Sequence, residues 1–284
     1  MDRFSKFNPK SCFLFFVLEI VLCLLLFNPA FLAVSLLSAL FYSIKLEGKK
    51  AVKRFFTFIL PLILFIGLFN MIFAHYGDTV FFTLFSADFT LESFFYGINQ
   101  GVMFSSVILW LSCYSMVMTS DKFLSVFSRI APNCALVFSM VLSFIPRLRK
   151  NAEEINDAGK LIETGESRLK KSISSFSALI TMTLEESIEV SDSMKARGFN
   201  KNRRAYSKYV FSFSDGVIIA VSIILFAVML YYKISGKTLF VFEPVMAFDY
   251  FSPLSLAIYA VMSFLPLITD LWEDAKWLYL KQKI

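Results

Sequence analysis

"FFTFILPLILFIGLFNMIFA", residues 55–74, is an apolar run without a single charged side chain. A helix needs about 20 apolar residues, with a range of about 17–25, to cross the hydrocarbon layer of a membrane. Pro61 lies inside the run, but membrane helices tolerate proline because neighbouring helices can satisfy the freed backbone groups. The run therefore predicts a membrane-spanning helix.

Five further apolar stretches have a comparable length, some of them with flanking residues: 11–27, 29–45, 97–118, 215–233 and 252–270. The whole chain is 57% hydrophobic and 18% charged, whereas about a quarter of the residues of a soluble domain are charged. The runs are continuous, unlike the alternating segments of membrane barrels. We therefore expect an all-α membrane protein with about six transmembrane helices. The first run exceeds the 7–15 residues typical of a signal peptide, so we expect it to be retained.

Positive charge predicts the orientation. The loop from His75 to Tyr96 contains no lysine or arginine. The N-terminus, the loop at 45–54, the stretch at 147–208 and the C-terminus are all rich in these residues. Since cytoplasmic loops carry the excess of Lys and Arg, both termini should be cytoplasmic. We expect a multi-pass protein of a bacterial-type cytoplasmic (inner) membrane.

A long insert divides the chain into three regions: transmembrane helices 1–4 at 1–118, an insert at 119–214, and transmembrane helices 5–6 at 215–284. The apolar part from Cys134 to Ile145 is too short to span and continues into a charged helix, with a bend expected near Pro146. A break is expected between Gly159 and Ser167. A second helix should follow at 168–197, because apolar residues recur there at helical spacing: Ile173, Phe176, Ile180, Leu184, Ile188 and Met194. The insert therefore predicts two long amphipathic cytoplasmic helices.

The second of these helices ends in "SDSMKARGFN", residues 191–200. Gly198 followed by Phe199 is typical of a helix terminus, and basic residues near it suit the helix dipole. Arg197 also offers a planar fork of donors that can bind a carboxylate bidentately. The pattern is compatible with a simple helix stop and with a docking point for a partner.

Few other residues suggest chemistry. Glu19 lies within the first apolar run, where a carboxylate is costly and marks a functional position; it should bond within the bundle or contact a partner. The four cysteines form no C-x-x-C pair, and one histidine, His75, cannot make a zinc site alone. The chain contains no G-x-x-x-x-G-K-[ST] phosphate loop, so ATP would have to be hydrolysed elsewhere. We predict no catalytic residue, metal site or cofactor.

Several segments in order along the chain resemble one family. "DRFSKFNPKSCFLFF" (2–16), "SDKFLSVFSRI" (120–130), "VLSFIPRLRKNAEEINDAGK" (141–160) and "EESIEVSDSMKARGF" (185–199) are similar to the transmembrane T component (CbiQ/EcfT-like) of energy-coupling factor (ECF) transporters. The resemblance implies a non-enzymatic energy-coupling subunit of an ATP-driven importer of vitamins or transition-metal ions. Its implied partners are two cytoplasmic ABC-type ATPases and a small substrate-binding membrane subunit (S component), within the lipid bilayer and without nucleic acid.

The resemblance also implies the contact residues. In the family, two coupling helices end in short arginine-bearing motifs that insert into the ATPases. The second motif corresponds to Ala196, Arg197 and Gly198. The first corresponds weakly to Ala158, Gly159 and Lys160, since "DAGKLIETGES" (157–167) lacks the arginine.

Two other functions remain as alternatives. An ordinary ABC importer permease carries a cytoplasmic Glu-Ala-Ala…Gly loop that "NAEEINDAGK" (151–160) resembles superficially. A membrane-embedded transferase would need clustered carboxylates to hold a metal-bound diphosphate. Asp215 and the acidic face at 185–192 are the available groups, and neither pairs aspartates at ligand spacing.

Overall fold

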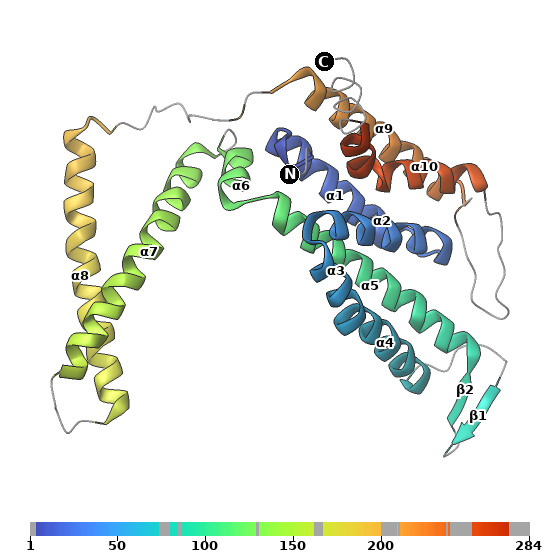
Figure 1. Cartoon of the computed structure of the whole chain (residues 1–284), viewed down its shortest axis with the longest axis horizontal. Coiled ribbons are helices and arrows are strands. Elements are labelled where there is room, and N and C mark those ends of the chain that lie inside the picture. Colours follow the sequence, from blue (N-terminus) through green and yellow to red (C-terminus); the bar gives the residue numbers. More distant parts are fainter. Residues whose placement is uncertain are drawn as a thin grey trace. The chain divides into compact units, whose positions relative to one another are not determined.

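The computed structural model describes residues 4–73, 80–84, 87–128, 131–161, 167–199, 209, 211–236, 238 and 252–272. The chain divides into two compact units. We call residues 1–120 with 209–284 the bundle unit and residues 121–208 the hairpin unit (Figure 1). His75 and part of the predicted break, 162–166, lie outside the described residues.

The bundle unit is built from apolar helices. In chain order its elements are η1 (Phe4–Lys6), α1 (Pro9–Leu25), α2 (Pro29–Glu47), α3 (Lys49–Arg54), η2 (Phe55–Ile59), α4 (Leu60–Phe73), β1 (Val80–Leu84), β2 (Ala87–Thr90), α5 (Leu91–Val117), α9 (Phe213–Ile234) and α10 (Pro253–Ser263). The helices α1 and α2 both begin at a proline that follows an asparagine cap. Asn8 accepts a hydrogen bond from the backbone N–H of Lys10, and Asn28 accepts one from that of Ala30, each at 3.1 Å. Asparagine at the cap and proline at the first position both favour a helix start.

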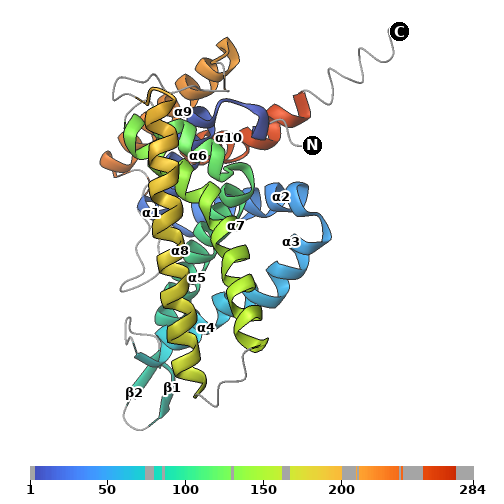
Figure 2. The ribbon, with the colours of Figure 1, turned by 90° about the vertical axis from the view of Figure 1, so that its left-hand side faces the viewer.

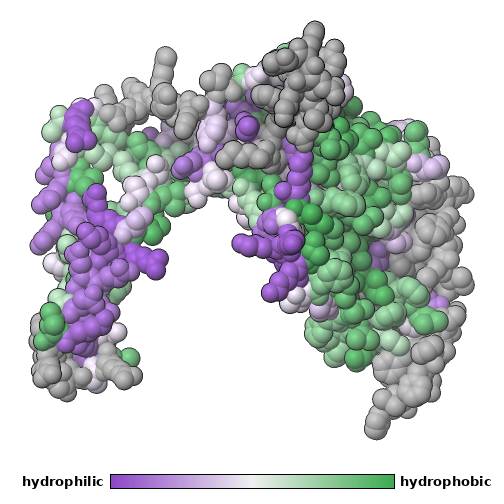
Figure 3. Space-filling view, viewed as in Figure 1, coloured by the Kyte–Doolittle hydropathy of each residue, from purple (hydrophilic) through white to green (hydrophobic). Residues whose placement is uncertain are grey.

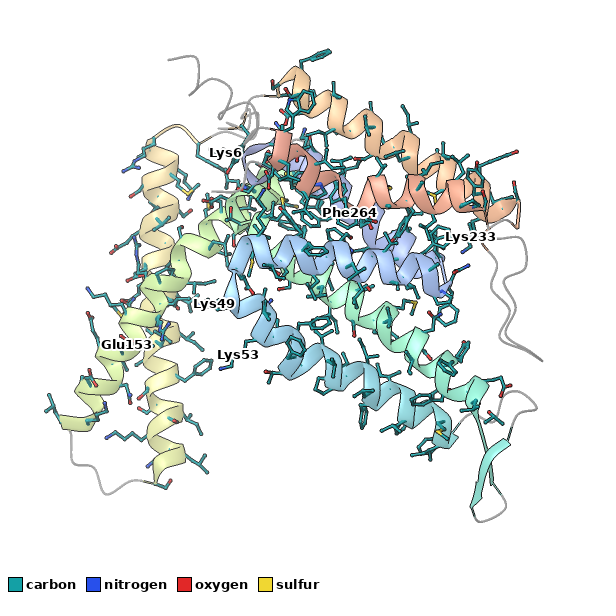
Figure 4. The ribbon with its side chains drawn as sticks, turned by 45° about the vertical axis from the view of Figure 1, so that its right-hand side comes forward. Lys6, Lys49, Lys53, Glu153, Lys233 and Phe264 are labelled. Atoms are coloured by element: carbon teal, nitrogen blue, oxygen red, sulfur yellow. The ribbon has the colours of Figure 1, made fainter. Side chains whose placement is uncertain are left out.

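Four helices of the described chain are long and apolar enough to cross a membrane: Pro29–Glu47, Lys49–Phe73, Leu91–Val117 and Phe213–Ile234. A fifth is formed if Pro253–Ser263 and Leu265–Trp272, which meet at a 59° bend, make one span; Phe264 lies at this bend (Figure 4). The helix α1 has 17 residues, or about 25 Å of helix. A multi-pass membrane protein is therefore confirmed, and the sixth span stays a prediction.

The outer surface of the bundle unit suits lipid. Large apolar side chains cover much of the face seen in Figure 3. On α4, Phe65 and Phe73 are 63% and 68% exposed. Only 11% of the apolar stretch within the Lys49–Phe73 segment is buried in the protein. An exposed apolar surface of this extent marks a site that contacts a membrane or another protein. Here the surface lies on helices that are long enough to cross a membrane.

Close backbone approach joins α4 to α5. A Cβ added at Gly97 would lie 2.6 Å from Cβ of Asn70 and 3.0 Å from Cα of Gly67, and one at Gly101 would lie 3.0 Å from Ile63 backbone atoms. Small residues at such contacts let membrane helices pack tightly. Asn70 also donates a hydrogen bond to Gln100 at 3.2 Å, so these two amides lie at the interface between α4 and α5.

Aromatic side chains fill the core at the N-terminal end of the chain. Phe4 is fully buried and packs edge to face against Phe15, Phe16 and Tyr42, with ring centroids 5.3, 6.0 and 6.2 Å apart. Trp110 of α5 joins this cluster. Edge-to-face pairs at this spacing stabilise a core beyond the area they bury. The segment before α1 is therefore part of the folded core.

Two aspartates from distant parts of the sequence hold that segment. The backbone N–H of Asn8 donates to Asp215 Oδ1 at 2.8 Å, and that of Phe4 donates to Asp270 Oδ1 at 3.2 Å. Lys45 forms an ion pair with Asp270 at 3.1 Å. Both aspartates are 3% exposed. Buried carboxylates require such partners. The segment Phe4–Asn8 is therefore hydrogen-bonded to Asp215 of α9 and to Asp270 in the helix Leu265–Trp272.

The region between α4 and α5 differs from the prediction. The predicted loop at 75–96 contains an antiparallel pair, β1 and β2, with Thr83 opposite Asp88. The helix α5 begins at Leu91, six residues before the predicted start at 97, because Thr90 caps it by accepting a hydrogen bond from the backbone N–H of Ser93. Hydropathy located the rest of α5 and missed its first six residues, which include Glu92 and Ser93.

The hairpin unit contains α6 (Ser120–Phe127) apart from its first residue, α7 (Pro132–Leu161) and α8 (Arg168–Ala196). Both views of the ribbon show α7 and α8 running in opposite directions, close at the end where α7 stops and α8 starts (Figure 2). Asn151 of α7, which is 7% exposed, donates to Glu186 Oε1 of α8 at 3.1 Å. The two long helices of the insert are therefore confirmed as elements, and α7 continues through Pro146.

Candidate functional site

The C-terminal end of α8 is closed by a specific hydrogen-bond pattern. The N–H of Gly198 donates to the carbonyl of Lys195 at 2.9 Å, and that of Phe199 donates to the carbonyl of Met194 at 3.0 Å. Gly198 has a φ of +74°. These two bonds with a left-handed glycine make a Schellman motif. The sequence "KARGF" therefore does form a helix stop, with Arg197 at the C-cap position.

The same motif leaves Arg197 available. Its side chain is exposed, and it makes no ion pair with any residue that the structure describes. The neighbouring cation, Lys195, is instead paired with Asp192 at 3.2 Å. A guanidinium at the end of a rigid helix, without a carboxylate partner in the described chain, can bind an acidic partner without first breaking a contact.

The other predicted contact, at Ala158, Gly159 and Lys160, is built differently. The break was predicted to begin at Gly159, but α7 continues to Leu161. Gly159 is therefore a helix-interior residue, and its added Cβ would lie 3.5 Å from Cε of Lys171. Lys160 forms an exposed ion pair with Asp157 at 2.7 Å. Because its cation is already paired and its glycine faces α8, this end does not repeat the geometry of Arg197.

The two ends are far apart within the hairpin unit. Gly159 packs beside Lys171, and Arg197 follows Lys171 by 26 positions along α8 (197 − 171). At 1.5 Å per residue this amounts to about 39 Å. One helix therefore connects the two predicted contact regions as a continuous rod.

Five of the six residues of the predicted apolar stripe of α8 face outward, whereas the sixth, Met194, is partly shielded and lies toward α7. The residues of α8 that are partly shielded include Lys171, Ser175, Leu179 and Thr183, and they lie on the side toward α7. The stripe residues are largely exposed, with exposed fractions of 42–69%: Ile173, Phe176, Ile180, Leu184 and Ile188. Five large apolar side chains along one exposed helix face form the kind of apolar surface that marks an interaction site.

Glu19 lies inside the bundle unit. It is fully buried, and Ser263 of α10 donates a hydrogen bond to its Oε1 at 2.6 Å. Tyr259 and Ser35 lie in the same buried cluster, and Trp110 donates to Ser35 at 3.1 Å. Of the two roles expected for Glu19, this geometry favours bonding within the bundle, where the carboxyl group links α1 to α10.

Asp215, which the transferase alternative would use as a metal ligand, is already occupied. Its Oδ2 accepts from the N–H of Ser212 at 2.8 Å, forming a capping box at the start of α9, and its Oδ1 accepts from Asn8. Among the residues that the structure describes, no group of three or more His, Cys, Asp or Glu side chains could hold a metal ion. Asp215 therefore caps α9 and holds the segment before α1 by accepting from the N–H of Asn8.

Sequence reasoning missed the contacts that join distant segments, namely Asn151 with Glu186, and the two aspartates that hold the N-terminal segment. Asn8 and Asp215 are separated by 207 positions. The pattern around Asp215 signals a helix cap, because Ser212 and Asp215 have capping-box spacing. It does not signal which distant backbone the second oxygen binds.

Comparison with known protein families gives a match over most of the chain. The family model CbiQ, described as cobalt transport protein, matches residues 4–208. The match includes α1 to α5 of the bundle unit and the whole hairpin unit, with Arg197 inside it. No curated protein matches the chain.

Proposed function

This chain belongs to the CbiQ family of cobalt transport proteins, and from that premise we propose that it is the energy-coupling scaffold of an ATP-driven ECF-type importer. In this function the chain hydrolyses nothing itself. It connects two cytoplasmic ABC-type ATPases to a small membrane subunit that binds the substrate, a transition-metal ion or a vitamin. The lever geometry of the hairpin unit supports the proposal.

The observation that carries the proposal is Arg197, an exposed cation at the capped end of a 29-residue helix that forms no ion pair within the described chain. A carboxylate-lined groove on an ATPase would bind its guanidinium bidentately. The second contact would lie about 39 Å away, around Lys160, so that the hairpin unit could reach two separate subunits. When the ATPases close on ATP, their movement would displace the ends of a rod that cannot shorten.

The exposed stripe of α8 supports the second half of the proposal. A substrate-binding membrane subunit offers an apolar surface, and Phe176, Ile180 and Leu184 present a matching one. Burial of such side chains stabilises a contact by roughly 25 cal/mol per Å². Movement of the rod would then be transmitted directly to the subunit packed on it.

The test is the Arg197→Ala variant. Removing one partner of a buried charge pair typically costs about 2–5 kcal/mol, which raises the dissociation constant by about 30-fold or more. We expect the variant to insert normally into membranes, to lose affinity for the ATPases, and to lose uptake. Arg149→Ala is the matched control, since Arg149 is an exposed arginine of α7 that is paired with Glu153 at 3.5 Å. Normal ATPase binding and uptake by Arg197→Ala would exclude the coupling role.

A further inference from the structure

We propose that the groove between α7 and α8 beside Arg197 is a socket for apolar side chains from an acidic segment of the same ATPase. The inference rests on the proposed function, and it adds a second contact to the arginine. The groove lies wholly within the hairpin unit and has a volume of about 650 Å³. Its apolar lining comes from both helices and from the segment after α8: Met140, Val141, Phe144, Val190, Met194 and Phe199.

The helix stop itself builds one wall of the groove. The Schellman bond from the N–H of Phe199 to the carbonyl of Met194 turns the chain back at Gly198. Phe199 and Met194 both line the groove, which is the apolar contact that accompanies this motif in proteins generally. Gly198, which presents Arg197, and two of the residues that line the groove, Met194 and Phe199, therefore belong to the same turn.

The groove is open and remains partly exposed. Val141, Val190 and Phe199 are 49%, 42% and 41% exposed, and Figure 3 shows apolar residues among the hydrophilic ones over the upper part of α7 and α8 in this view. A volume of 650 Å³ falls within the range of about 300–1,000 Å³ that is usual for binding clefts. The space therefore fits several side chains from one helical turn of a partner, in the helix-in-groove mode.

Charge around the groove selects the partner. Arg147 and Lys195 line it, and Arg197 lies two residues after Lys195, which is itself paired with Asp192 at 3.2 Å. Arg147 makes no ion pair with the described part of the chain. An amphipathic segment with carboxylates beside its apolar face would complement this surface, and like charges would be repelled.

Proximity then identifies which partner carries that segment. A protein that binds Arg197 must be acidic at that point, and it would lie within one helical turn of Lys195, Met194 and Phe199. Such a partner covers the mouth of the groove when it binds. An ATPase that accepts Arg197 is therefore also the molecule placed to fill the socket.

Cysteine protection tests the occupant. Cys134 is exposed and the other three cysteines are buried, so Cys134→Ser gives a background without accessible thiols. In it, Ser191→Cys places a thiol in the groove, and Ser177→Cys places one at an exposed position of α8 outside the lining. With the full chain in detergent and the cognate ATPase pair added, we expect alkylation by N-ethylmaleimide to slow about tenfold at Ser191→Cys and less than about twofold at Ser177→Cys, as for a site fully desolvated on binding.

Charge reversal at one position tests the chemistry. Val190→Glu and Val190→Lys both place a charge in the apolar lining, but the glutamate offsets the positive charge of Arg147 and Lys195 and repels an acidic segment, whereas the lysine adds to that positive charge. We expect the dissociation constant for the ATPase pair to rise at least about tenfold more with glutamate than with lysine. Circular dichroism and gel filtration of both variants establish that the fold is retained. Equal effects of the two substitutions would overturn the acidic partner.

The Arg197→Ala variant separates the two hypotheses. If it binds the ATPases normally, the coupling function fails and the socket fails with it. If Arg197→Ala weakens ATPase binding, but Ser191→Cys in a chain that retains Arg197 stays fully reactive in the complex with the ATPases, the coupling function stands and the socket alone is wrong. Protection of Ser191→Cys by a substrate-binding membrane subunit, and not by the ATPases, would also overturn the inference.

Discussion

Gly198→Ala tests whether the shape of the helix end, and not its charge alone, presents Arg197. Gly198 has a φ of +74°, and a Cβ built on it meets nothing within 4 Å. The substitution therefore creates no steric clash with the rest of the described chain. Its whole effect comes from the backbone, because a residue with a Cβ disfavours the left-handed region.

The magnitude follows from that backbone preference. Holding a non-glycine residue in the left-handed conformation costs about 1–2 kcal/mol. In the free chain the variant can avoid this cost by extending or unwinding the last turn of α8. Binding that requires the Schellman turn must restore the conformation, so the dissociation constant for the ATPases should rise about 5- to 30-fold.

The chain offers a matched control. Gly236 follows α9 with a φ of +73°, and its N–H donates to the carbonyl of Lys233 at 3.0 Å. Gly236→Ala therefore imposes a similar backbone cost at a helix end in the other unit. We expect it to leave ATPase affinity within about twofold of wild type, since it carries no proposed contact.

The assay is the dissociation constant of the purified chain for the ATPase pair, measured for Gly198→Ala, Gly198→Asn and Gly236→Ala. Asparagine tolerates the left-handed region better than alanine, so Gly198→Asn should fall between wild type and Gly198→Ala. If Gly198→Ala binds as tightly as wild type, the turn is unnecessary. If asparagine is as harmful as alanine, the backbone explanation is wrong.

Three further predictions concern the bundle unit. Asp215→Ala leaves two backbone N–H donors without an acceptor at about 1–3 kcal/mol each, so the thermal unfolding midpoint in detergent should fall, and by less for Asp215→Asn. Gly97→Ala should also lower the unfolding midpoint, at an overpacking cost of about 1–3 kcal/mol, because the new Cβ would lie 2.6 Å from Cβ of Asn70. Gly216→Ala is the control and should have a mild effect, since the nearest atom to its new Cβ is 3.6 Å away. Asp88→Cys should react with an impermeant thiol reagent added outside intact cells, and labelling from the cytoplasmic side alone would contradict the predicted topology.

The sequence predicts the elements of this protein better than their contacts. Continuous apolar runs locate most bundle helices to within a few residues, since hydropathy and helix caps act locally. The predicted start of α5 was wrong because Glu92 and Ser93 interrupt the apolar sequence there. The antiparallel strand pair was missed because β1 and β2 are short. They also lie in the segment at 75–96, which was predicted to be a loop from its lack of lysine and arginine.

Contacts across the sequence were inaccessible to the same reasoning. Nothing near Asn151 indicates that its amide would meet Glu186, and nothing near Asp270 indicates that it would bind the N–H of Phe4. Each depends on how helices pack in three dimensions, which periodicity leaves open. The end of α8 was predictable in detail, because a Schellman motif is formed by five or six consecutive residues.

The difference between the two contact regions has a physical consequence for coupling. Arg197 lies beyond the last helical residue and has no ion pair among the described residues, whereas Lys160 lies within α7 and is paired with Asp157. Breaking an exposed pair of that kind costs about 0–1 kcal/mol, and the Lys160 ammonium, unlike the Arg197 guanidinium, cannot bind a carboxylate bidentately. The α8 end should therefore supply most of the affinity for the ATPases, and the α7 end should supply little. A rod held firmly at one end and weakly at the other pivots about the firm end, which would make the two ATPase contacts unequal in function.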